Sequence, residues 1–433
     1  MKTNIISKWT ALLLTFSGMA ALPLTVTAAA GDNKVVTSST TETGQTYRSN
    51  DISQAALQVS GNGVIYTGTN ITLTGTAETG AGRYGAYVYN RGRLDLYGGS
   101  ASTTGSVTGG AMAVRVDGTS IANLHNVNIS VMAGNGVLLT TSSTVVVIGG
   151  TITVSGSNGG HCGVQINSSS VAHLENITIN IIDDGNARGF GVWGDTGSIV
   201  SGSGLSITTQ GFRGYGLSLT GGAMMSIYNS TINTSGTSAV GAMVNTVVDG
   251  VTSSLWLNDV DITTTGEGAC GLALGDSPNT TGITAIYATN VRVNTSGADA
   301  SAVYLGNRPD GLQILEIDGG SYTAANGAGL YIANMNQTNF SDEYQVTIKG
   351  GATITGTVAL LVEESGDNPQ TRVTVDVADN SSLNGGITTT GSTNTTVNLD
   401  RTTLTGDVAG SNSGTLNINA NASTLIGDII AND

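Results

Sequence analysis

A short phrase that begins with a small residue, usually glycine, and continues with aliphatic residues occurs eleven times along the chain. Examples are Gly85-Ala-Tyr-Val, Gly136-Val-Leu-Leu and Gly216-Leu-Ser-Leu. The phrases begin at positions 85, 110, 136, 163, 191, 216, 241, 271, 301, 329 and 358, so they are 25 to 30 residues apart. Self-similarity at such a period is typical of solenoids, in which each repeat forms one coil of a stack.

Alternation of apolar and polar residues at every second position indicates that the coils are built from strands. In the unit that begins at Gly216, Leu217 and Leu219 would face one side and Ser218 the other, and two further short strand patterns follow. Parallel stacking of equivalent strands satisfies the backbone groups without hairpins. We therefore predict an all-β fold, a single-stranded right-handed parallel β-helix (β-solenoid) with three short strands per coil.

An Asn, Asp or Gly usually stands three residues before the third strand pattern. The set comprises Asn126, Gly149, Asn176, Gly204, Asn229, Asp259 and Asn290. These residue types tolerate left-handed turns. Equivalent side chains of successive coils lie about 4.8 Å apart, so we expect the asparagines to hydrogen-bond along the stack as an interrupted structural ladder.

Composition narrows the possible functions. Glycine supplies 63 of the 433 residues, proline only 4, charged residues 10% and aromatic residues 5%, which suits a narrow stack of small-residue turns better than a conventional globular enzyme. The net charge of -15 predicts no nucleic-acid partner, because phosphates need a basic surface.

The chain divides into four expected segments. Residues 1–30 form a signal peptide, with Lys2 and Lys8 before an apolar run and alanines at 28 to 30 as the cleavage site, which predicts export by the Sec route. Residues 31–84 would form an N-terminal cap and the first coils, 85–371 the main coils, and 372–433 shorter C-terminal coils. No later stretch of 18 apolar residues predicts a membrane helix.

The two cysteines, Cys162 and Cys270, each stand immediately before the repeated phrase, four coils apart. Equivalent positions four coils apart are separated by roughly 19 Å, whereas a disulfide needs Cα atoms within about 7 Å. We therefore predict two free, largely buried thiols with a packing role.

The C-terminal coils carry a more specific pattern, a strand followed by Ser or Thr with Leu or Ile, then Gly-Asp and an apolar residue. It occurs in "TVNLDRTTLTGDVAG" (396–410) and "TLNINANASTLIGDI" (415–429). With the coils and the signal peptide, the chain resembles the passenger domain of a pertactin-like autotransporter. The resemblance implies display on the cell surface or release from a Gram-negative type outer membrane, and often adhesion to a host or matrix glycan or protein.

One feature of that family is missing from the sequence. A C-terminal β-barrel translocator would need many alternating strands after the passenger, and the chain stops at Asp433. The outer membrane would be a partner only through a translocator barrel that this chain lacks, so we expect either a truncated or split passenger or an exported β-helix without its own translocator.

β-Helices also host polysaccharide-degrading enzymes, so carboxylates are candidate catalysts. The best candidates are Asp183 and Asp184 in one long turn, Asp259 and Asp261 beside a strand, and the sequence Gly160-His161-Cys162-Gly163. Paired Asp residues are usually solvated turn residues, and the accompanying motifs of such hydrolases are absent. We predict no complete catalytic constellation, no metal site and no cofactor.

A serine-protease function is also disfavoured. "GDTGS" (194–198) resembles the nucleophile motif of protease autotransporters, but Thr196 occupies the place of the serine. His125, His161 and His173 lie within earlier coils, and each is expected to be a polar outward residue. His125 aligns with Glu175 two coils away, about 10 Å apart, which is too far for direct contact.

Two outward rows remain as candidate binding surfaces. The row on the first strand is unusually apolar and comprises Tyr87, Met112, Leu138, Gln165, Trp193, Ser218, Met243, Ala273 and Tyr331. Exposed aromatic and methionine side chains in a line could bind sugars or proteins, although turn insertions could instead cover them. The predicted ligand-binding residues are Tyr87, Tyr89, Trp193 and Tyr331.

The row on the third strand is a hydroxyl and amide array. It comprises Thr72, Thr74, Asn128, Ser130, Thr153, Ser155, Thr178, Asn180, Asn233, Ser235, Thr263 and Thr265. Regular threonines could order water as an ice-binding face does, but Asn and Ser interrupt the array, and a soluble strand surface is the simpler interpretation. The turns at 249–255 and 336–344 are further candidate binding loops.

The sequence thus favours an exported adhesive passenger without catalysis. Two alternatives stay open: a polysaccharide-active β-helix enzyme, and a non-binding stalk whose roughly 14 coils would span about 65 Å.

Overall fold

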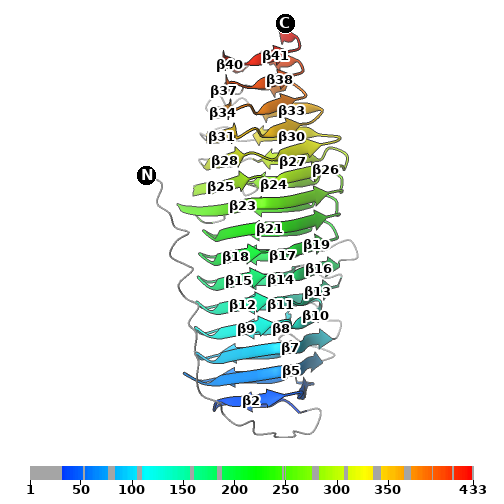
Figure 1. Ribbon diagram of the computed structural model, residues 1–433, viewed down its shortest axis with the longest axis vertical. Helices are drawn as coiled ribbons and strands as arrows, with labels where there is room; N and C mark the ends of the chain where they lie inside the picture. Colours follow the sequence, from blue (N-terminus) through cyan, green and yellow to red (C-terminus); the bar gives the residue numbers. More distant parts are fainter. Residues whose placement is uncertain are drawn as a thin grey trace.

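The computed structural model describes residues 32–51, 54–76, 83–104, 110–156, 160–182, 188–245, 248, 250–275, 282–306, 311–334, 343–364, 372–392, 394–411 and 414–431. The coils stack in chain order from β2 near one end of the molecule to β41 near the other (Figure 1). Equivalent strands of successive coils pair in parallel, so the fold is the predicted parallel β-helix. The expected signal peptide lies outside the described residues.

The first strands of the coils form one sixteen-stranded sheet among the described residues. Its strands, in spatial and chain order, are β1 (Lys34–Val36), β4 (Leu57–Ser60), β6 (Arg83–Tyr89), β8 (Ala111–Val116), β11 (Gly134–Leu139), β14 (His161–Ile166), β17 (Gly189–Gly194), β20 (Tyr215–Leu219), β22 (Val240–Val244), β24 (Cys270–Leu274), β27 (Ser301–Leu305), β30 (Ala328–Asn334), β33 (Val358–Glu364), β36 (Ile387–Thr390), β39 (Val408–Gly410) and β42 (Ile429–Ala431).

The second and third strands belong to one twenty-six-stranded sheet of the described chain, because four long strands run through both rows without a break. These four are β5 (Ile65–Thr76), β7 (Arg93–Thr104), β21 (Met224–Thr234) and β23 (Val251–Thr264). The remaining second-row strands are β2 (Thr40–Thr43), β9 (Ile121–His125), β12 (Thr144–Ile148), β15 (Val171–Glu175), β18 (Ile199–Ser203), β25 (Gly282–Thr289), β28 (Leu312–Asp318), β31 (Glu343–Lys349), β34 (Arg372–Ala378), β37 (Asn394–Asp400) and β40 (Thr415–Asn421). The remaining third-row strands are β3 (Thr46–Ser49), β10 (Asn128–Met132), β13 (Thr151–Ser155), β16 (Thr178–Ile182), β19 (Ser206–Thr209), β26 (Arg292–Thr295), β29 (Ser321–Ala324), β32 (Thr353–Thr355), β35 (Ser382–Asn384), β38 (Thr403–Thr405) and β41 (Thr424–Ile426).

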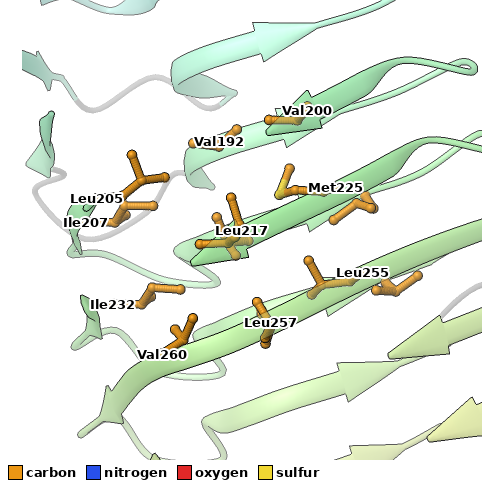
Figure 2. Close-up of a cluster of buried hydrophobic side chains, with 14 of the residues drawn as sticks. Val192, Val200, Leu205, Ile207, Leu217, Met225, Ile232, Leu255, Leu257 and Val260 are labelled. Carbon is orange, nitrogen blue, oxygen red and sulfur yellow. The ribbon is translucent and has the colours of Figure 1, made fainter. Parts of the chain in front are cut away.

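The interior is filled by aliphatic side chains from all three strand rows. Val192 of the first row, Met225 of the second and Ile232 of the third are fully buried and converge with their neighbours (Figure 2). Each fully buried aliphatic side chain contributes about 1.5 to 3 kcal/mol. Because inward residues alternate with outward ones, this core fixes which side chains of every strand face the outside.

The glycine of the repeated phrase occupies a position with no room for a side chain. A Cβ atom on Gly216 would lie 2.5 Å from the carbonyl oxygen of Gly241 and 2.3 Å from Ile232 Cγ2. The register also corrects three phrase positions. Ala113, not residue 110, is equivalent to Gly85, and Ala302, not residue 301, is equivalent to Gly271. Ala359, not residue 358, is equivalent to Gly329.

The residues of the expected turn ladder adopt left-handed turns. Their φ angles are 53° for Asn126, 52° for Asn176, 46° for Asn229, 53° for Asp259 and 51° for Asn290.

Direct contact along this ladder is interrupted because Asn and Gly alternate in the first coils. A Cβ atom on Gly149 would lie 2.2 Å from Asn126 Oδ1, and one on Gly204 would lie 2.3 Å from Asn176 Oδ1. The asparagine side chain of one coil therefore occupies the space that a side chain on the next coil would need. Asn126 and Asn176 are two coils apart, roughly 10 Å, and do not contact each other directly.

Hydrogen-bonded amide ladders occur instead on the outside of the C-terminal coils. Asn398 Nδ2 donates to Asp376 Oδ1 at 2.7 Å across 22 residues, and Asn419 Nδ2 donates to Asn398 Oδ1 at 2.8 Å across 21 residues. These coils are shorter than the 25 to 30 residues of the repeated phrase.

Both candidate binding loops require correction. Residues 251–255 belong to β23, and Tyr344 is fully buried in β31. Residues 249 and 336–342 lie outside the described residues. The described part of the chain contains no helix long and apolar enough to cross a membrane.

Candidate binding face

The outer side of the sixteen-stranded sheet, which we call the aromatic face, carries two neighbouring columns of side chains. The first column is Tyr87, Arg115, Leu138, Gln165, Trp193, Ser218, Met243, Ala273, Tyr304 and Tyr331. The second is Tyr84, Met112, Asn135, Cys162, Phe190, Tyr215, Val240, Cys270 and Ser301.

The predicted row was therefore wrong at one coil and incomplete at another. Met112 lies in the second column, because Arg115 is the residue in register with Tyr87 and Leu138. Tyr304 occupies the coil that the prediction left empty.

The middle of the aromatic face forms an apolar cluster separate from the solenoid core. Its buried members are Cys162, Phe190, Tyr215, Val240, Met243 and Ala273, and Trp193, Cys270 and Tyr304 pack against them. A parallel β-helix needs apolar residues on its inward positions only. The inward pattern therefore does not account for an apolar cluster on the outward positions. Six of its members are at most 9% exposed, so they pack against one another, and Trp193, Cys270 and Tyr304 are its partly exposed members.

Trp193 of β17 is the centre of this cluster. Its ring stacks on Phe190 at 5.0 Å between centroids, and Phe190 meets Tyr215 edge to face at 5.4 Å. Trp193 Nε1 donates a hydrogen bond to Thr220 Oγ1 at 3.1 Å, and that hydroxyl donates to Asp195 Oδ1 at 2.8 Å. These contacts hold the half-buried indole in one orientation.

A second aromatic group lies on β6 toward the N-terminal end. The Tyr87 ring stacks on Tyr89 at 4.6 Å and is tilted against Tyr84 at 5.3 Å. The Arg115 guanidinium lies 5.3 Å from the centroid of the Tyr87 ring and forms an ion pair with Asp117 at 3.2 Å. Burial, the largest cause, raises the pKa of Tyr87.

A third group lies on β27 and β30. Tyr304 and Tyr331 meet edge to face at 5.5 Å, and the Tyr331 hydroxyl donates a hydrogen bond to Glu363 Oε2. Burial, followed by this hydrogen bond to the carboxylate, raises the pKa of Tyr331.

The four predicted binding residues thus share one face but not one pocket. In the register, Tyr87 is four coils from Trp193, and Trp193 is five coils from Tyr331. At about 4.8 Å per coil these separations are roughly 19 Å and 24 Å. Such a line of groups suits an extended partner surface better than a small molecule.

The prediction missed the second column, including Phe190 and Tyr215. The sequence contains a signal for it. Phe190 stands three residues before Trp193, so strict period-two alternation would put the two side chains on opposite sides of the sheet. At Gly191, between them, the alternation shifts by one position, so both side chains face outward. In the register Phe190 pairs with Tyr215 and Trp193 with Ser218, and Val192 between them points inward.

The two cysteines form no disulfide, as predicted, and they occupy one column of the aromatic face four coils apart. Cys162 is fully buried, and burial raises the pKa of its thiol. Cys270 is only partly buried, so the predicted burial holds fully for Cys162 alone.

The carboxylate candidates do not form a catalytic pair in the described part of the chain. Asp261 is bound to Arg292 of the next coil at 2.6 Å, and Asp259 lies in its left-handed turn. Asp183 and Asp184 lie outside the described residues. No group of three or more His, Cys, Asp or Glu side chains among the described residues could hold a metal ion.

The histidines and the protease-like motif occupy separate places. His125 stacks on Tyr97 and is two coils from Glu175 in the register, as predicted. His161 is buried with 2% of its surface exposed, so its expected outward position is wrong. Thr196 lies in a left-handed turn, where its N–H donates to Asp195 Oδ1 at 2.7 Å.

The outer side of the third-strand row, which we call the hydroxyl face, is also built from two columns. One is Thr72, Ser100, Asn128, Thr151, Thr178, Ser206, Thr231, Asp261, Arg292, Ser321, Thr353, Ser382, Thr403 and Thr424, and the other is Thr74, Ser102, Ser130, Thr153, Asn180, Thr208, Asn233, Thr263, Asn294, Thr323, Thr355, Asn384 and Thr405. Three predicted members lie elsewhere. Ser155 is in register with Met132 and Ile182, and Ser235 and Thr265 lie just beyond the ends of β21 and β23.

Comparison with known proteins finds a likeness of fold. No protein-family model and no curated protein matches the chain. The fold matches that of Vag8 in the cryo-EM structure of the Vag8–C1 inhibitor complex, with a TM-score of 0.57 and 17% sequence identity over 93% of this chain and 96% of that chain. Vag8 is a pertactin-like autotransporter passenger. The chain has the β-solenoid fold of such a passenger.

Proposed function

We propose that this protein is an exported passenger that binds a protein of a host surface or extracellular matrix through the aromatic face. The observation that carries the proposal is the line of partly exposed aromatic rings on outward positions of this face, where Trp193 packs on the second apolar cluster. Export rests on the signal-peptide pattern of residues 1–30, and display at the cell surface rests on the resemblance to pertactin-like passengers.

A protein partner fits the spacing of the three aromatic groups. They extend over nine coils, roughly 43 Å, and each presents partly buried rings beside a charged or polar group. Interface cores are enriched in aromatic residues and arginine, and their strongest contributions come from Trp, Tyr and Arg. The likeness to Vag8, whose solved complex contains C1 inhibitor, supports protein binding by a solenoid of this kind.

The proposal includes no catalysis. Asp259 lies in a left-handed turn, and Asp261 forms an ion pair with Arg292. The histidines at 125 and 173 lie on the second-strand row, away from those carboxylates. A non-binding stalk, in which the packed cluster of the aromatic face would serve stability alone, is the alternative that binding experiments distinguish.

Arrays of matrix proteins, serum proteins and glycans, probed with purified residues 31–433, would test the proposal. Specific binding should be lost in the double variant Tyr87→Ser, Trp193→Ser and kept in a matched variant of the hydroxyl face, Thr153→Ser. Circular dichroism would check that both variants keep their strand content. Binding that survives the double variant would place the site elsewhere, and absence of binding to any protein on the array would contradict the proposal.

A further inference from the structure

The outer side of the second-strand row places short serine side chains beside an exposed tryptophan. Residues His173, Ser201, Ser226, Trp256 and Tyr287 follow one another in register on five successive coils. Trp256 is 37% exposed. This column is on a different sheet from the aromatic face, so the inference does not depend on the proposed function.

The geometry of the Trp256–Tyr287 pair shows how the indole is oriented. The ring centroids are 5.5 Å apart and the planes differ by 11°. Two rings that lie side by side in one plane must keep their centroids roughly 6 Å or more apart, because their edges would otherwise clash. The Trp256 and Tyr287 rings are closer than this. The rings therefore stack, and Tyr287 covers one face of the Trp256 indole.

The opposite indole face is turned toward the preceding coil, where the column holds only Ser226. Buried Met225 and Leu255 (Figure 2) fix Ser226 and Trp256 as outward residues. A serine side chain is too short to cover an indole. An aromatic ring therefore faces a space that one coil of the stack leaves unfilled, which is about 4.8 Å deep along the axis.

The surrounding side chains turn this space into a slot. Met224 and Tyr228 lie two residues to either side of Ser226 on β21, and both point outward, with Met224 42% exposed. Farther along the column, Ser201 lies two coils from Trp256 and His173 three coils, roughly 10 Å and 14 Å, so both are beyond the reach of a ring stacked on the indole. The slot has one aromatic wall, two flanking side chains and the hydroxyl of Ser226.

We infer that the slot binds a pyranose ring of a neutral glycan, stacked on the open face of Trp256. A pyranose presents a C–H face of about one coil's thickness to an aromatic ring and hydroxyls at its edge, where the Ser226 hydroxyl can donate or accept a hydrogen bond. None of the slot residues is Lys or Arg, and the protein carries a net charge of -15. Acidic sugars and phosphorylated ligands would be repelled, and a neutral sugar would not.

Tryptophan fluorescence gives a direct test. Beyond residue 30 the chain contains only Trp193 and Trp256, so Trp193→Phe leaves Trp256 as the single indole of the mature protein. This variant would be titrated with cellohexaose, maltohexaose, laminarihexaose and mannohexaose. At least one should produce a saturable blue shift of the emission, since a sugar on the open face displaces water from the indole.

A slot-filling variant supplies the decisive comparison. Ser226→Tyr, in the Trp193→Phe background, would place a second ring on Trp256, as Tyr287 already does on the other side. The affinity for the responding oligosaccharide should fall by about tenfold or more. The matched control Thr231→Tyr, on the same strand but on the hydroxyl face, should leave the affinity unchanged.

A shift that persists in Ser226→Tyr, or no saturable shift with any of the four oligosaccharides, would overturn the inference. If Ser226→Tyr does not fold, Trp256→Leu tested by calorimetry would replace it, with the same expected loss. Loss of protein binding through the aromatic face would leave this titration unaffected, so failures of the two proposals are distinguishable.

Discussion

The aromatic face and the hydroxyl face are two outer surfaces of the same coils, yet aromatic and apolar side chains are concentrated on the first and hydroxyl side chains on the second. On β17, Trp193 alternates with buried Val192, whereas on β13, Thr153 alternates with buried Ile152. The inward residues under both faces are buried aliphatic side chains. The inward pattern therefore does not determine the outer composition, and the aromatic rings are concentrated on one face.

The largest expected effect comes from an inward position at the corner between the two faces. A Cβ atom on Gly266 would lie 1.8 Å from the carbonyl oxygen of Gly236, so Gly266→Val forces two coils apart. We expect a loss of about 3 kcal/mol or more in the free energy of unfolding, because the obstacle is backbone and cannot move aside. Guanidinium denaturation would measure it.

The outward residue Thr263, three positions away on β23, is the matched control. Thr263→Val should leave the denaturation midpoint nearly unchanged. Equal losses in the free energy of unfolding for the two substitutions would contradict the distinction between inward and outward positions.

A smaller loss is expected from Trp193→Ala on the aromatic face. This substitution removes the stacking on Phe190 and the hydrogen bond to Thr220, and it opens the outer apolar cluster. We expect a destabilisation of about 2 kcal/mol without loss of strand content, since the solenoid core is untouched. Thermal unfolding followed by circular dichroism would test this, and no change in midpoint would show that the cluster is not packed as described.

The alkaline stability should report on Tyr331. Its raised pKa means that the folded protein keeps this hydroxyl protonated at pH values where the unfolded chain, with a tyrosine pKa of about 10, has released the proton. The stabilising contribution is complete below about pH 10 and is lost as the pH rises beyond it. Tyr331→Phe should therefore weaken the decline of stability between pH 10 and 11, by at most about 1 kcal/mol because the ring is partly exposed.

Denaturation midpoints measured at pH 8, 10 and 11 would compare the native protein with Tyr331→Phe. Tyr89→Phe, which changes another tyrosine of the aromatic face, provides the control. Parallel declines in all three proteins would contradict the assignment of this effect to Tyr331.

The smallest effect belongs to the hydroxyl face. Thr153→Val keeps the β-branched shape and replaces one outward hydroxyl, so we expect a change within about 0.5 kcal/mol and no effect on partner binding. A large loss in either measurement would show that this face does more than keep the protein in solution.

The sequence by itself determined the parallel β-helix, because glycine-led phrases at intervals of 25 to 30 residues and period-two alternation leave few other ways to bury the aliphatic residues. It also placed Tyr87, Trp193 and Tyr331 correctly on one outward row. Local alternation is enough for such assignments while a strand pattern is unbroken.

Only the tertiary structure decided what lies beside each residue on the neighbouring coils. Coil lengths vary, so the register cannot be counted along the chain, and an error of three residues put Met112 in the place of Arg115. The same inter-coil register brings Phe190 to Tyr215 and sets Trp256 against Ser226. These contacts join residues 25 to 30 positions apart, and they depend on backbone hydrogen bonds between coils that no local pattern specifies.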